Sequence, residues 1–89
     1  MRPLLARTAR FDRMADAVAI ERRDATVLVT REALEDWYGK PVPEAAAVQR
    51  ALAIEPILRR AANAVAPDDG TITITKRLLA AVRETNDAD

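Results

Sequence analysis

Three stretches of the chain have the side-chain pattern of β-strands. Residues 17–21 and residues 26–30 each place two aliphatic side chains on one face of an extended backbone. Only a short polar segment separates these two stretches, so they predict an antiparallel hairpin. Residues 71–75 alternate isoleucine with threonine throughout, which predicts a third strand that is buried on one face only.

Residues 31–38 predict a short helix with defined ends. The Thr30 hydroxyl can cap the first turn, and Gly39 can adopt the left-handed conformation that ends a helix. The apolar side chains fall at the spacing i, i+3 and i+4, namely Leu34, Trp37 and Tyr38. Within this helix Trp37 is expected to pack in the core.

A longer helical pattern covers residues 44–65 and is interrupted by Pro56. An internal proline removes a hydrogen bond and clashes with the preceding turn. Either one helix is kinked near residues 52–56 or two helices meet there, and the continuous apolar pattern favours the kink. Residues 67–70 predict a turn, and Thr75 can cap a last helix that ends near Glu84.

The order of these elements predicts a small α+β domain. We expect a three-stranded, mostly antiparallel sheet with helices packed on one face, in the order β-β-α-α-β-α and in two layers. Residues 1–16 are expected to form an arginine-rich arm that Phe11 and Met14 anchor to the body. Residues 17–84 then form the single domain, and residues 85–89 form a frayed tail.

The segment Val29–Gly39, which follows a predicted hairpin, resembles the domain of unknown function 1488 family of short bacterial proteins. Phe11-Asp12, the segment 54–57 and the segment 69–75 agree with the same pattern, so the resemblance covers most of residues 11–80. Pro56 departs from it. The family has no established activity, so the resemblance implies a fold and no catalytic residues.

Composition excludes several classes of site. The 89 residues contain no His, no Cys and no Ser, which removes the usual zinc ligands, thiol and serine nucleophiles, and disulfides. Only two Gly are present, so no glycine-rich phosphate loop exists. We therefore expect no enzyme activity, no catalytic, cofactor-binding or metal-binding residues, and no cofactor.

The remaining sequence features bear on location. No apolar run approaches the roughly 20 residues of a membrane-spanning helix, and the apolar start of the chain stops at Arg7, too early for a secretory signal. We therefore expect a cytoplasmic protein with no membrane partner.

Arginine is enriched near the start of the chain, which raises the possibility of phosphate contacts. The candidates are Arg2, Arg7, Arg10 and Arg13. Against this, the chain has 14 basic and 14 acidic residues and few aromatic ones, whereas nucleic-acid-binding domains are usually strongly basic. Nucleic acid is therefore a possible but disfavoured partner, and a solvated surface with ordinary ion pairs is the simpler interpretation.

Other polar clusters have structural explanations. Glu32, Glu35 and Asp36 lie on one short helix, where acidic residues near the first turn stabilise the helix dipole. The segment Asp68-Asp69-Gly70 is better explained as a turn than as part of a calcium loop, because the further oxygen ligands of such a loop are missing.

The predicted hairpin has a less polar outer side, since Leu28, Ala17 and Ala19 point away from the predicted core. Such a surface is commonly covered by a second copy or another protein. Candidate partner-binding residues are Trp37, Tyr38 and Leu28. Of the two aromatic residues, Tyr38 is the one expected to be exposed, since core packing is the simpler interpretation of Trp37. The sequence thus favours a non-enzymatic protein-interaction or regulatory module that self-associates as a homodimer or binds a protein partner. The alternatives are a nucleic-acid-associated regulator that uses the N-terminal arginines and a compact inhibitor of another macromolecule.

Overall fold

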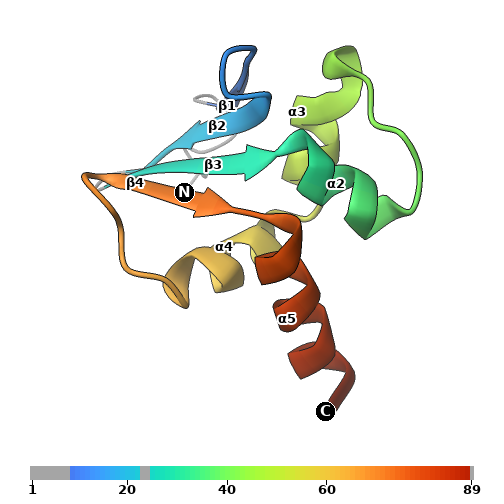
Figure 1. Cartoon of the computed structure of the whole chain (residues 1–89), viewed down its shortest axis with the longest axis vertical. Helices are drawn as coiled ribbons and strands as arrows, with labels where there is room; N and C mark the ends of the chain where they lie inside the picture. Colours follow the sequence, from blue (N-terminus) through green and yellow to red (C-terminus); the bar gives the residue numbers. More distant parts are fainter. Residues whose placement is uncertain (1–8, 23–24, 89) are drawn as a thin grey trace, which may run out of the picture.

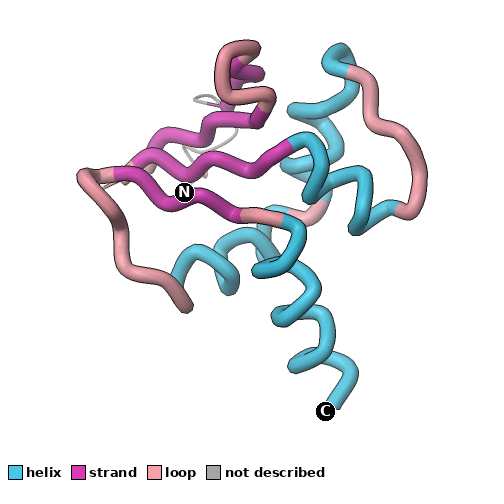
Figure 2. Tube along the Cα trace, viewed as in Figure 1, coloured by secondary structure: helices cyan, strands magenta, loops and turns pink. Residues whose placement is uncertain are grey.

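The computed structural model describes residues 9–22 and 25–88, which form a four-stranded sheet and four helices (Figure 1). The elements are β1 (Ala9–Asp12), β2 (Ala17–Glu21), β3 (Thr26–Thr30), α2 (Arg31–Tyr38), α3 (Glu44–Ala53), α4 (Glu55–Asn63), β4 (Thr71–Ile74) and α5 (Lys76–Ala88). The strands form one layer, and the helices lie beside and below it in the view of Figure 2. The predicted α+β class is confirmed.

The number of strands was predicted wrongly. The sheet has the order β1-β2-β3-β4, and the additional strand β1 lies in residues that the sequence assigned to an N-terminal arm. β1 pairs antiparallel with β2, with Phe11 opposite Val18. A four-residue segment with two charged side chains has a weak strand pattern of its own, so pairing with β2 is what makes it a strand. Residues 1–8 of the predicted arm lie outside the described residues.

The sheet is mixed because β4 runs parallel to β3, with Val27 opposite Ile72 and Val29 opposite Ile74. Parallel neighbours need a long crossover, which α2, α3 and α4 supply here. As β3 and β4 end at the same edge of the sheet, the helices that follow them, α2 and α5, begin side by side and pack together (Figure 1).

The kink favoured at Pro56 was wrong, since α3 and α4 are two separate helices. Ile54 between them has φ −115° and ψ 30°, outside the helical region. Pro56 falls in the first turn of α4, where no intrahelical partner exists for an N–H. In a continuous helix its ring would clash with the carbonyl of Leu52, so the break relieves this clash.

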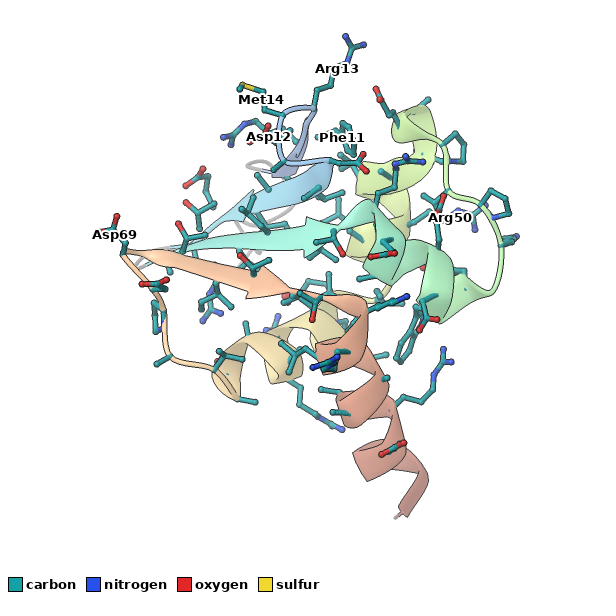
Figure 3. The ribbon with its side chains drawn as sticks, viewed as in Figure 1. Phe11, Asp12, Arg13, Met14, Arg50 and Asp69 are labelled. Atoms are coloured by element: carbon teal, nitrogen blue, oxygen red, sulfur yellow. The ribbon has the colours of Figure 1, made fainter. Side chains whose placement is uncertain are left out.

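The predicted helix ends and turns are mostly confirmed. Thr30 Oγ1 accepts from Ala33 N at 3.0 Å, and Gly39 has φ 72°, so α2 begins and ends as expected. Asp69 (φ 56°) and Gly70 (φ 78°) form the turn before β4, which projects from one edge of the molecule (Figure 3). The last helix, α5, continues past its predicted end at Glu84 to Ala88, through most of the segment predicted to be a frayed tail.

The hydrophobic core lies between one face of the sheet and the helices. Buried residues of this face alternate along β2, β3 and β4 and pack against Leu34, Leu58 and Leu79. Phe11 of β1 packs against the edge of this core. Among residues 9–22 and 25–88, none of the helices combines the length and the apolar character needed to cross a membrane.

Candidate functional site

The turn between β1 and β2 holds its shape through its own polar groups. Asp12 Oδ1 accepts hydrogen bonds from Met14 N at 3.0 Å and from Ala15 N at 3.2 Å. Asp16 N donates to Arg13 O at 3.2 Å, and Asp16 has the left-handed φ of 52°. An aspartate that bonds backbone N–H groups two and three residues ahead is a common way to fix a turn. The backbone around Met14 is therefore fixed by local hydrogen bonds.

Arg31, the first residue of α2, ties this turn to the helical layer. Its backbone N donates to Asp16 O at 2.9 Å, and its Nε donates to Asp16 Oδ1 at 2.9 Å. Its Nη1 donates to Glu35 Oε2 at 3.3 Å and to Val42 O at 3.4 Å. The hydrogen bond and the charge of Asp16 raise the pKa of Arg31, with smaller contributions from Glu35 and Glu44. Three segments are thus joined at one guanidinium.

At the end of the molecule formed by this turn, one apolar side chain projects into solvent (Figure 3). Met14 is 98% exposed, and its neighbour Arg13 has a side chain that is 83% exposed. Beside them is a shallow hollow lined by Phe11, Arg13, Glu44 and Ala45. Arg13 Nε lies 3.2 Å from Glu44 Oε1, which links the turn to the first turn of α3. We call Phe11, Arg13, Met14, Glu44 and Ala45 together the hairpin end.

The anchoring role expected for Met14 was therefore wrong. Phe11 packs against the core as expected, whereas Met14 contributes nothing to it. Along β1 the side chains alternate, and the turn after Asp12 points the next apolar residue outward. The signal in the sequence was the position of this methionine between two aspartates of a turn.

The predicted partner-binding residues do not form one surface. Trp37 is partly buried beneath Arg83 of α5, whose guanidinium carbon lies 4.1 Å from the ring centroid and whose Nη2 donates to Trp37 O at 2.6 Å. Tyr38 instead faces α3, where its hydroxyl donates to Arg50 O at 2.7 Å. Burial raises the pKa of Tyr38, and the charge of Arg50 opposes this in part. The two aromatic residues thus hold α2 between α5 and α3.

Leu28, the third predicted partner-binding residue, lies elsewhere. It is on β3 and points to the face of the sheet opposite the helices, where it is partly buried. Its cross-strand neighbours on that face are Ala19 and Thr73. Ala17 and Ala19 of the same face are 1% and 0% exposed, so this part of the face is less open than the sequence predicted.

The candidate phosphate-binding arginines also separate. Arg10 is on β1 and lies 3.1 Å from Glu21 on β2, while Arg13 pairs with Glu44 on α3. Their positive charges each face a carboxylate, and they belong to different surfaces. Arg2 and Arg7 lie outside the described residues.

Glu35 and Glu32 of α2 have separate partners. Glu35 Oε2 accepts from Val42 N at 3.0 Å in addition to its bond with Arg31, and Glu32 lies 3.7 Å from Lys76. Within residues 9–22 and 25–88, the side chains form no group of three or more acidic residues that could hold a metal ion. The turn at Asp68 closes by a pair of backbone hydrogen bonds with Thr71, at 2.8 and 3.0 Å.

Comparison with known proteins gives no match. The chain matches no protein-family model, no curated protein and no solved structure.

Proposed function

We propose that this protein is a non-enzymatic interaction module that self-associates through its hairpin end. The observation that carries the proposal is Met14, a large apolar side chain that is almost fully exposed on a turn fixed by hydrogen bonds. Single exposed apolar residues are ordinary on protein surfaces, so Met14 is informative only together with its surroundings. A hollow with an aromatic wall, Phe11, lies at the same end of the molecule.

The exposed Met14 side chain and the hollow beside it have complementary shapes, as contact with a second copy of the chain requires. In a twofold dimer the same patch is used by both partners, so each Met14 can enter the hollow of the other copy. Methionine fits irregular apolar sites well, and a sulfur–aromatic contact with Phe11 contributes about 0.3–1.5 kcal/mol. A fixed turn also loses little conformational freedom on binding.

The charges at the hairpin end are complementary in the same arrangement. Arg13 and Glu44 are both largely exposed, with side chains 83% and 50% accessible, and they pair within one chain at 3.2 Å. Across a twofold axis, Arg13 of each copy can face Glu44 of the other without leaving a charge unpaired. Exposed pairs of this kind contribute little energy but favour one orientation of the partners.

The size of the contact suggests weak, concentration-dependent association. A stable interface covers about 800 Å² of each partner, roughly one seventh of the 5866 Å² of accessible surface of this chain. The hairpin end comprises the end of β1, the β1–β2 turn and the first turn of α3. We therefore expect a contact that buries less area than a stable interface does. The resemblance to the domain of unknown function 1488 family adds no activity to this proposal.

Sedimentation velocity over a concentration series tests the proposal. We expect the mass to rise from monomer towards dimer between about 10 µM and about 1 mM. Met14→Glu places a charge in the contact and should weaken the association at least about tenfold, while Met14→Leu should preserve it. Ala45→Glu fills the hollow and should weaken the association to a similar extent.

Ala80→Glu provides the matched control, because it makes the same change at an exposed alanine of α5, away from the hairpin end. It should leave the association unchanged. A strict monomer at every concentration would refute self-association, and equal weakening by Ala45→Glu and Ala80→Glu would refute the hairpin end as its location.

A further inference from the structure

A second cavity, separate from the hairpin end, opens between the β2–β3 hairpin and α4. Its floor is apolar and consists of Ile20, Val27, Leu58 and Ala62, all of which are buried in the core. The cavity measures about 60 Å³. Because a buried water occupies at least about 10–15 Å³ by this measure, there is space for roughly four atoms of water size. The volume is that of a short branched hydrocarbon group.

An apolar cavity of this size is better filled by hydrocarbon than by water. Water in such a cavity needs two to four polar partners, and the floor supplies no polar side chains. Small-molecule sites usually combine such a floor with a few polar groups at the rim that orient the ligand. The rim therefore determines which ligand the cavity fits.

Three ionisable side chains form the rim, namely Arg22, Glu55 and Arg59. Glu55 and Arg59 lie on adjacent turns of α4, and their charges neutralise each other, since Arg59 Nη2 is 2.6 Å from Glu55 Oε2. Arg22 is partly buried, and within the described part of the chain its guanidinium makes neither an ion pair nor a hydrogen bond. Two positive charges and one negative charge leave the rim with a net charge of +1.

We propose that this cavity binds a short branched aliphatic carboxylate, with its hydrocarbon group on the apolar floor and its carboxylate on Arg22. Arginine presents two parallel N–H donors that match a carboxylate, and such charge-assisted bonds are stronger when the site is partly shielded from water. A free branched-chain acid and the C-terminal leucine of a peptide share this chemistry. The proposal does not depend on self-association, because it involves no residue of the hairpin end.

Titration of the full chain with isovalerate, followed by amide chemical shifts in NMR spectra, tests the proposal. We expect saturable shifts at Ile20, Val27 and Leu58 with a dissociation constant of about 1 mM. Isovaleramide has the same shape without the charge, and acetate has the charge without the hydrocarbon. Each should bind at least about tenfold more weakly than isovalerate.

Arg22→Gln should weaken isovalerate binding about tenfold, while Arg77→Gln, at an exposed arginine of α5, should not change it. Comparison of isovalerate with N-acetyl-alanyl-leucine identifies the source: tighter binding of the peptide supports a protein C-terminus, and tighter binding of isovalerate supports a free acid. The proposal is overturned if isovalerate causes no saturable shifts up to about 20 mM, or if isovaleramide binds equally well.

Discussion

The two faces of the sheet are built from the same strands but present different side chains. The face toward the helices presents aliphatic side chains from three strands, namely Val18, Ile20, Val27, Val29, Ile72 and Ile74. The opposite face combines Leu28, Ala17 and Ala19 with polar side chains: Glu21 is bonded to both Arg10 and Thr26, and Thr73 is exposed. Successive residues of a strand point to opposite faces, so a single alternating pattern specifies both surfaces.

The difference teaches that burial alone does not identify the core. β2 is buried on both faces, since Ala17 and Ala19 are as inaccessible as Val18. Only Val18 and Ile20 belong to the hydrophobic cluster shared with the helices. Alanine contributes little apolar area, so we expect the helix-covered face to supply most of the stability and the other face to supply local order.

Of the changes that test the difference between the two faces, Ile74→Ala should lower the free energy of unfolding most. Ile74 is fully buried on the helix-covered face, and truncation removes apolar contacts and leaves a cavity. We expect a loss of about 2–5 kcal/mol in the free energy of unfolding, measured by urea denaturation with the single Trp as the fluorescent probe. Thr73→Ala, at the adjacent exposed position, should change it by about 0.5 kcal/mol or less. Equal losses from both variants would contradict the division into two faces.

Ala19→Leu should have an intermediate effect. Ala19 is 0% exposed on the face opposite the helices, between Arg10 and Leu28 in the strand register. A larger side chain must displace its neighbours, so we expect destabilisation by about 1–3 kcal/mol in the same denaturation experiment. Thr73→Leu tests an exposed position of the same face and should be nearly neutral. A neutral Ala19→Leu would mean that this face is open at β2 as well as at β4.

The smallest expected effect on stability is that of acidification, which protonates Glu21 on the face opposite the helices. Hydrogen bonds from Arg10 and Thr26 lower the pKa of Glu21 in the folded protein. A carboxyl with a depressed folded pKa contributes stability that is present above its unfolded pKa and is lost as the pH falls through the folded pKa. The difference in unfolding midpoint between the wild type and Glu21→Gln should therefore be present at pH 7 and decline in acid, below pH about 4.

Arg10→Gln provides the control for this prediction. As Arg10 is the largest cause of the lowered pKa, Glu21→Gln should have a smaller effect on stability in the Arg10→Gln background. An unchanged effect of Glu21→Gln in that background would show that the Arg10 contact contributes nothing in solution.

The sequence predicted local features well because neighbouring residues determine them. The hydroxyl of Thr30 and the glycine at position 39 set the ends of α2, and Gly70 completes the turn before β4. The candidate site was less predictable. Met14 was expected to be an anchor. The two aspartates around it indicate a turn, but only the tertiary structure places this turn beside the first turn of α3 and leaves Met14 in solvent.

The sequence by itself determined the α+β class, the inward faces of three strands and the caps of the helices, since each depends on periodicity or on bonds within a few residues. Only the tertiary structure decided that residues 9–12 are a strand and that β4 lies parallel to β3. Strand pairing depends on partners distant along the chain. Its free energy arises only when those partners meet, so no local pattern contains it.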